Sequence, residues 1–306
     1  MNIKKPAFSG LAPYLTVFTS RNMAIMVLLG FASGLPLPLT SGTLQAWLTV
    51  VGTDLRTIGI FSLVGIPYTI KFIWSPLMDR FVPPWLGRRR GWIILTQLIV
   101  MIGVGIMGFI SPIHAPLMLA ILAVIVAFTS ASQDIVVDAY RTDVLSPVER
   151  GAGVAVFLTG YRLAMLVAGA LALILSEHIG WQNTYLLMAG LMIIGVAGAL
   201  AGKEPDSRII PPKSLEEAIW GPLKDFFSRR LALIFMLLII LYKLGDAYAG
   251  TLTTAFLLRG VNFTPTEVGT INKGMGLIAT IIGALFGGGL MIKLGLYRSL
   301  MTFGFL

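Results

Sequence analysis

The chain has 306 residues, of which 56% are hydrophobic and only 12% are charged. Its mean hydropathy of +0.86 is that of an integral membrane protein. There is no Cys, which excludes disulfides, thiol catalysis and Cys-based metal sites. The two histidines, His114 and His178, lie in different short loops, which argues against a His metal site or a His proton relay. We therefore expect neither a metal nor a cofactor.

Apolar runs of about 20 residues, the length that crosses a bilayer, recur along the chain. They predict eight membrane-spanning helices, at residues 22–50, 55–78, 91–111, 115–143, 151–176, 181–202, 231–258 and 265–292. A ninth helix opens near Ser299, close to the last residue, so we expect the chain to be a piece of a longer protein. The first 20 residues show no apolar core followed by a small-residue cleavage site, so no cleaved signal peptide is predicted.

The basic residues set the expected orientation. Most of the 23 Lys and Arg lie in the N-terminal tail and in or beside the even-numbered loops, whereas only Arg56 and Arg259 lie in odd-numbered loops. The positive-inside rule then predicts a multi-pass membrane protein with a cytoplasmic N-terminus. This bias accounts for the net charge of +9 without a nucleic-acid partner.

The domain organisation follows from a long charged loop. Residues 203–230 read as a cytoplasmic linker between a six-helix bundle at 1–202 and a partial bundle at 231–306, with Ser214 and Glu217 as a capping box for a short helix. The two bundles resemble each other weakly at an offset of about 210 residues. The matched pairs are Gly34 with Gly245, Thr40 with Thr251, Thr43 with Thr254 and Gly59 with Gly269. Parallel repeats of this kind predict an all-α membrane fold of the major facilitator type, with one six-helix half and an incomplete second half.

The loop between helices two and three supports that fold. Residues 75–90 resemble the facilitator motif G-x-x-x-D-R-x-G-R-R, although Ser75 replaces the first Gly and extra residues lengthen the turn. The resemblance implies a cytoplasmic latch, with Arg150 as the expected partner of Asp79. The expected gating residues are Asp79, Arg80, Arg88 and Arg150. One interfacial ion pair is worth about 0–1 kcal/mol, so such a latch can break and re-form.

Seven charged residues are expected at bilayer depth: Lys71, Asp134, Asp138, Arg162, Lys243, Asp246 and Lys273. A charge at the bilayer centre costs about 2.5–3.5 kcal/mol on insertion scales, which favours a functional role. The alternative is a structural salt bridge between helices. The excess of basic residues is consistent with an anionic substrate.

Helix four carries the most informative charges. Asp134 and Asp138 are spaced i, i+4 and lie on one helix face. At a rise of about 1.5 Å per residue, the expected depths allow an Asp134–Arg162 pair and a Lys71–Asp138 pair. We expect one of the two aspartates to carry the coupling proton, with Lys71 or Arg162 as its partner.

Helix one contributes shape. Pro36 and Pro38 remove backbone donors in its middle and predict a break, which membranes tolerate where the helix lines a cavity. The alternative is close packing through small residues. Polar residues at comparable positions are expected to line a substrate path, and they are Gln45, Gln133, Tyr161, Tyr242 and Asn272.

Three segments carry a closer resemblance: Lys71 to Arg80, Leu86 to Arg90, and Gln133 to Asp143, of which the last is the most specific. They resemble the AmpG muropeptide permeases. The resemblance implies proton-driven import of anhydro-muropeptides across the inner membrane, which feeds peptidoglycan recycling and β-lactamase induction. The related acetyl-coenzyme A transporters are the nearest alternative, and another anionic solute, a sugar or a peptide is also open.

Other classes of function fit less well. A membrane enzyme is disfavoured because no His cluster, metal-ligand spacing or Ser–His pair on one face is present. A channel is disfavoured because the charges form no ring of one sign. A membrane scaffold or sensor stays open.

Overall fold

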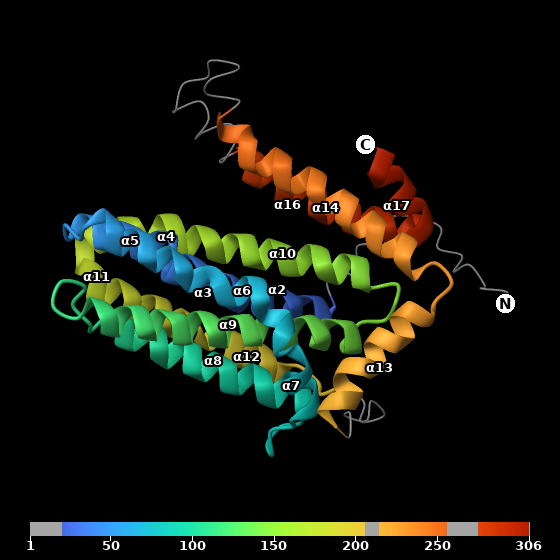
Figure 1. Cartoon of the computed structure of the whole chain (residues 1–306), viewed down its shortest axis with the longest axis horizontal. Coiled ribbons are helices and arrows are strands. Elements are labelled where there is room, and N and C mark those ends of the chain that lie inside the picture. The colour runs from blue at the N-terminus through green and yellow to red at the C-terminus, as the bar shows by residue number, and fades with distance from the viewer. Residues whose placement is uncertain (1–19, 206–213, 256–274, 306) are drawn as a thin grey trace. The chain divides into compact units, whose positions relative to one another are not determined.

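A computed structural model describes residues 20–205, 214–255 and 275–305, and every element in these ranges is a helix (Figure 1). The chain divides into two compact units: residues Met1–Ile210 with Ala284–Leu306 form unit 1, and Pro211–Gly283 form unit 2. The expected all-α membrane fold is confirmed. In the described residues, five stretches are long and apolar enough to cross a membrane: Arg21–Val50, Arg56–Ile73, Arg88–Met107, Pro116–Val144 and Arg150–Ala201.

The last of these stretches is two spans. Its 52 residues would extend about 78 Å as one helix, more than twice the hydrocarbon thickness of a bilayer. The chain turns at Gly180, whose φ of 80° and ψ of 160° are not helical. The elements are α10 (Arg150–Leu166), the π-helical turn η3 (Val167–Leu171), α11 (Ala172–Leu191) and α12 (Ile193–Ala201). The first six predicted spans are therefore all present in unit 1.

The first span is broken twice. It consists of α2 (Arg21–Gly34), α3 (Pro36–Thr40) and α4 (Gly42–Val50). Ser41 between α3 and α4 has φ −125° and ψ −100°, outside the helical region. The break predicted from the two prolines is thus confirmed.

Buried side chains from other spans hold this break. The Tyr185 hydroxyl donates to the carbonyl of Leu39 (2.9 Å), a group that the interrupted helix leaves without its regular amide partner. The Thr43 hydroxyl donates to the carbonyl of Ala168 in the π-helical turn (2.6 Å). The irregular part of span one is therefore bonded to the irregular part of span five.

The second span is also irregular. It runs through α5 (Leu55–Phe61), η1 (Ser62–Gly65), α6 (Ile66–Ile70), η2 (Lys71–Ile73) and α7 (Ser75–Arg80). Pro76 has no amide hydrogen for the carbonyl of Phe72, and the Ser75 hydroxyl donates to that carbonyl instead (3.1 Å). The 3-10 turn that results carries Lys71, so the proline determines where this cation lies.

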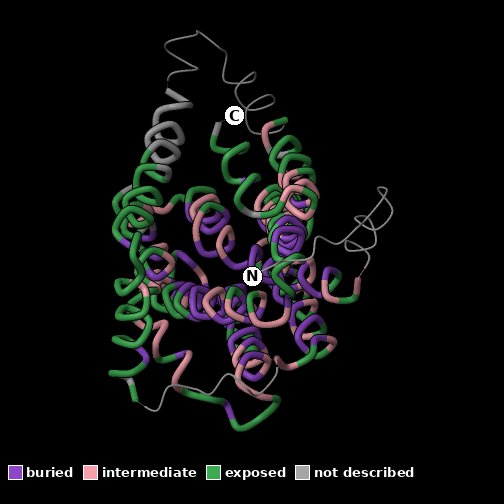
Figure 2. Tube along the Cα trace, turned by 90° about the vertical axis from the view of Figure 1, so that its right-hand side faces the viewer, coloured by how far each residue is buried: buried purple, intermediate pink, exposed green. Residues whose placement is uncertain are grey.

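Small residues determine how the spans of unit 1 pack. A Cβ at Gly30 or Gly34 of α2 would collide with the carbonyl of Phe157 or Tyr161 in α10, and a Cβ at Gly160 would collide with the Val27 carbonyl. The α2 and α10 backbones are therefore in direct contact. The remaining long helices are α8 (Arg88–Met107) and α9 (Pro116–Val144), which pack on each other. Buried residues follow the inward sides of these helices (Figure 2).

The chain continues with α13 (Leu215–Ser228), α14 (Ala232–Ala255), α16 (Gly276–Leu294) and α17 (Leu296–Phe305). The predicted cap of α13 is present, since the Glu217 amide donates to the Ser214 hydroxyl (3.0 Å). The domain limits expected at residues 202 and 231 stay predictions. The start of the predicted span 265–292 lies outside the described residues.

Candidate functional site

An ion pair lies inside unit 1. Lys71 Nζ of η2 is 3.7 Å from Asp134 Oδ2 of α9, and the two side chains are 32% and 16% exposed. Asp134 is ten residues from the end of α9 at Val144, or about 15 Å along the helix. Removing one partner of such a pair leaves an uncompensated charge at this depth, which is strongly unfavourable.

The other expected pairings differ from those in the structure. Asp138 pairs with Arg141 of its own helix (3.0 Å), and its side chain is 51% exposed. The Arg162 guanidinium contacts the sulfur of Met165 (3.9 Å). The expected Asp134–Arg162 and Lys71–Asp138 pairs are therefore wrong. The reason is that α6 and η2 pack against α9 where Asp134 faces them, while Arg141 already neutralises Asp138.

Several buried polar side chains lie on the elements that carry the Lys71–Asp134 pair or pack against them. We define the polar cluster as Ser33, Tyr68, Ser130 and Gln133 together with the Lys71–Asp134 pair. Ser33 lies beside Asp134 and Tyr68 lies beside Ser130. Both amide atoms of Gln133 are buried without a hydrogen-bond partner in the described part of the chain, and the three hydroxyls have close polar neighbours but no hydrogen bond of good geometry there. Because buried polar groups are normally bonded, this cluster is suited to bind a polar ligand.

The structure describes only some of the other residues that were expected to line the substrate path. Tyr161 of α10 lies within electrostatic reach of Asp134. Gln45 is half-buried on α4, and its side chain makes no hydrogen bond to the polar cluster in the described residues. Lys243 is exposed on α14. The side chains of Tyr242 and Asp246 and the whole of Asn272 and Lys273 lie outside what the structure describes.

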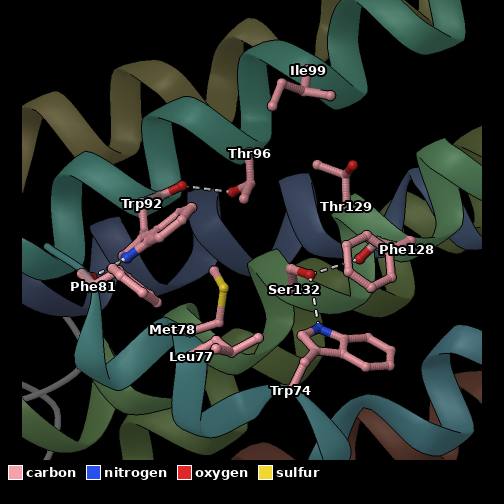
Figure 3. A pocket seen from close by; sticks show the side chains of 10 residues that line it. All are labelled: Trp74, Leu77, Met78, Phe81, Trp92, Thr96, Ile99, Phe128, Thr129 and Ser132. Atoms are coloured by element: carbon pink, nitrogen blue, oxygen red, sulfur yellow. Dashed lines mark hydrogen bonds between the residues drawn. The ribbon is translucent and has the colours of Figure 1, made fainter. Parts of the chain in front are cut away.

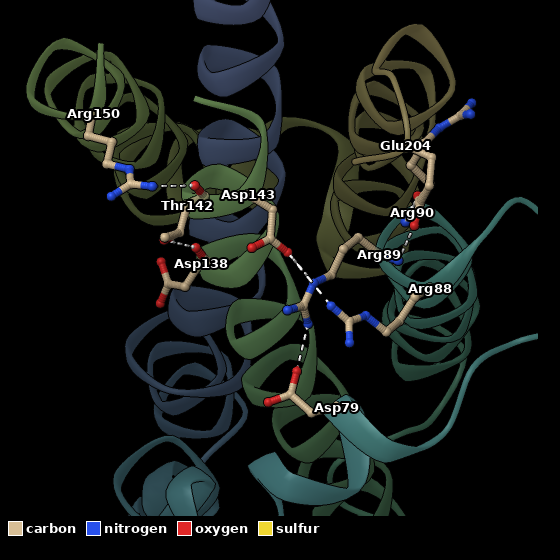
Figure 4. A network of polar contacts seen from close by, with 9 residues as sticks. All are labelled: Asp79, Arg88, Arg89, Arg90, Asp138, Thr142, Asp143, Arg150 and Glu204. Carbon is tan, nitrogen blue, oxygen red and sulfur yellow. Dashed lines mark hydrogen bonds and ion pairs between the residues drawn. The ribbon is translucent and has the colours of Figure 1, made fainter. Parts of the chain in front are cut away.

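A charged network occupies one end of unit 1, which we call the basic end (Figure 4). Arg89 at the start of α8 bonds Asp79 of α7 and Asp143 of α9, each at 2.8 Å. Arg88 approaches Asp143 to 4.0 Å. The Arg150 guanidinium instead donates to the carbonyl of Thr142 (3.2 Å). The expected Asp79–Arg150 pair is thus wrong, because Arg89 is nearer in the chain and reaches Asp79 first.

Glu204 ties the loop after α12 into this network. Its carboxylate accepts the backbone amides of Arg89 and Arg90 at 2.8 and 2.9 Å, and so caps the positive end of the α8 dipole. The Arg90 side chain donates to the carbonyl of Ala199 at the end of α12 (2.8 Å). Spans two, three, four and six are therefore joined at the basic end by charged groups.

Sequence reasoning did not select several of these residues, namely Ser33, Tyr68, Arg89, Ser130, Asp143 and Glu204. Arg89 and Asp143 lie inside the motifs that were recognised, so testing every charge of those motifs would have found them. Ser33, Tyr68 and Ser130 are uncharged and carry no such sequence signal.

Comparison with known proteins agrees with this architecture. Residues 14–306 match the model of the Major Facilitator Superfamily. The chain belongs to the major facilitator superfamily. Its expected resemblance to AmpG-type permeases is confirmed: it is 56% identical over 294 residues to the Anhydromuropeptide permease of Escherichia coli (strain K12), covering 96% of this chain and 60% of that relative.

Two further relatives are more distant. An uncharacterized protein of Haemophilus influenzae is 38% identical, with 94% of this chain and 68% of the relative covered. The protein named Putative transporter AmpG 4 of Rickettsia conorii is 32% identical, with 94% and 72% covered. The chain spans about three fifths of the Escherichia coli relative. As a facilitator-superfamily member with several apolar spans, it is a multi-pass membrane protein, and its Escherichia coli relative is named a permease.

Proposed function

We propose that this chain forms part of an inner-membrane permease that imports anhydro-muropeptides and couples their entry to protons. The name of the Escherichia coli relative, at 56% identity, supports the substrate. The observation on this chain that carries the mechanism is the Lys71–Asp134 pair within the polar cluster. In this proposal the N-terminus and the basic end lie in the cytoplasm, in keeping with the positive-inside rule.

Asp134 couples proton and substrate through Lys71. A proton that binds the Asp134 carboxylate cancels its charge and ends the ion pair. The Lys71 ammonium is then an unpaired cation in a low-dielectric site, where it attracts a carboxylate of the incoming peptide. Hydroxyls and the Gln133 amide of the polar cluster bond the neutral parts of the substrate. Substrate binding thus favours the protonated state of Asp134, which is the requirement for symport.

The network at the basic end acts as the gate. Asp79 and Asp143 approach Arg89 from different spans, so separating α7 from α9 breaks at least one bond. Asp79 is 45% exposed and Asp143 only 13%, so the Asp79 contact is the weaker one and opens first. Arg80, Arg88 and Arg150 keep this end positive, which attracts an anionic substrate towards it once the gate has opened.

The test is uptake of labelled GlcNAc-anhydro-muropeptide into right-side-out vesicles that contain the protein, with and without a pH gradient. Asp134→Asn should remove the gradient-driven part, which is about tenfold accumulation per pH unit for one proton, and should keep substrate exchange at equal pH. Asp138→Asn, one turn away and half-exposed, is the matched control and should keep both activities.

Each outcome separates the parts of the proposal. Proton coupling through Asp134 would be overturned if an uncoupler left uptake unchanged. It would also be overturned if the Asp134→Asn variant still accumulated substrate. Unlabelled acetyl-coenzyme A, a sugar and a plain peptide are tested as competitors of this uptake. If one of them reduces the uptake and unlabelled muropeptide does not, that solute replaces the muropeptide as the proposed substrate. Failure to transport any of them, by this chain and by a version extended to the length of the Escherichia coli relative, favours the scaffold or sensor alternative.

A further inference from the structure

A groove opens between spans two, three and four of unit 1, and none of the residues that line it belongs to the polar cluster (Figure 3). Its volume is about 320 Å³, and its walls include Trp74, Leu77, Phe81, Trp92, Ile99 and Phe128. We call it the tryptophan groove. No ligand is assigned to it by the proposed transport mechanism.

The groove presents apolar surface only, because its polar groups are already bonded. The Trp92 indole donates to the carbonyl of Phe81 (2.7 Å), and the Trp74 indole donates to the Ser132 hydroxyl (3.0 Å). Ser132 in turn donates to the carbonyl of Phe128 (2.8 Å). A sugar or a peptide would find no free donor here and would lose its own hydration, so the groove selects against polar ligands.

The depth of the groove matches a lipid tail. Trp92 is four residues and Ile99 eleven residues from the start of α8 at Arg88, or about 6 and 16 Å along the helix. This range runs from the headgroup level to about the middle of a bilayer whose hydrocarbon core is about 30 Å thick. Phe81 and Phe128 are 54% and 45% exposed, so the groove is open to the surroundings of the helices at this depth.

A cation without an acidic partner lies where the groove reaches the basic end. The Arg80 guanidinium stands 5.9 Å from the centre of the Phe81 ring. Among the described residues Arg80 forms no ion pair with an acid, whereas Arg88 and Arg89 both pair with Asp143. An anionic group beside Arg80 would neutralise its positive charge.

We propose that the tryptophan groove holds an acyl chain of an anionic phospholipid whose phosphate lies at Arg80. The groove accounts for the tail and Arg80 for the phosphate, and a zwitterionic lipid is the poorer fit because the ammonium of its own headgroup offsets the phosphate charge that Arg80 would neutralise. Because Arg80 follows Asp79, a bound lipid also supports the end of α7 that bonds Arg89. The inference does not depend on which solute is transported.

The test uses the protein in nanodiscs with a trace of phosphatidylglycerol that carries a diazirine on its acyl chain, and phosphatidylcholine with the same tail as the comparison. After photolysis, adducts are mapped by mass spectrometry to peptides of the groove. Phosphatidylglycerol should label groove peptides about fivefold more than phosphatidylcholine, as expected for one Arg near an anionic headgroup. Arg80→Gln should remove this preference. Arg150→Gln, which removes an exposed Arg of α10, is the matched control and should retain it.

The tail is tested separately with Ile99→Trp, which fills the groove and should reduce labelling by both lipids. Equal labelling by the two lipids in the unaltered protein would overturn headgroup selection at Arg80. Labelling on outer faces of the helices but none in the groove would show that another part of the protein covers it, and would overturn the proposal as a whole.

Discussion

Arg89 forms two ion pairs of equal length whose acidic partners differ in burial. Its bonds to Asp143 and Asp79 have the same length of 2.8 Å, but the Asp143 side chain is 13% exposed and the Asp79 side chain is 45% exposed. Charged hydrogen bonds in a shielded site contribute about 1.5–3 kcal/mol, and exposed pairs contribute about 0.2–1 kcal/mol. We therefore expect a coupling energy of about 2 kcal/mol for Arg89–Asp143 and about 0.5 kcal/mol for Arg89–Asp79.

Double-mutant cycles measure these energies. Arg89→Gln is combined with Asp143→Asn and, separately, with Asp79→Asn, and free energies of unfolding are measured in detergent micelles titrated with dodecyl sulfate. The control is the Arg229–Asp225 pair of α13, which is shorter at 2.6 Å but 68% and 67% exposed. Its coupling should be the smallest of the three. A ranking that follows distance, with Arg229–Asp225 the strongest, would refute the argument from burial.

Two further predictions concern how the spans are held together. Gly30→Ala places a methyl group against the carbonyl of Phe157 and should lower the free energy of unfolding by about 1–3 kcal/mol. Gly190→Ala is the control: no atom lies near its added methyl group, so the free energy of unfolding should stay unchanged or rise. Equal effects of the two variants in the same unfolding assay would mean that the α2–α10 contact is not close-packed. Tyr185→Phe leaves the buried Leu39 carbonyl without its donor and should cost about 1–2 kcal/mol, and a variant as stable as the parent would show that the break in span one does not need this bond.

The contacts of helix one bear on two interpretations that the sequence left open. Its glycines and prolines were compatible either with a lined cavity or with packing. The structure contains both arrangements on different faces of the same part of α2: Gly30 and Gly34 press α2 onto α10, and Ser33 between them joins the polar cluster. One turn of a helix can serve both purposes because residues four apart share a face, while a residue one position away is rotated by about 100°.

The sequence alone determined the first six spans, because hydropathy over about 20 residues and the backbone limits of proline are local properties. It also singled out Lys71, Asp134 and Asp138 as charges inside those spans. Only the tertiary structure decided their partners. Depth along each helix allowed Lys71 to meet either aspartate, and the choice depended on how η2 packs on α9 and on Arg141 one turn away. Side-chain pairing depends on helix rotation and neighbour order, and neither is encoded in the spacing of charges within one span.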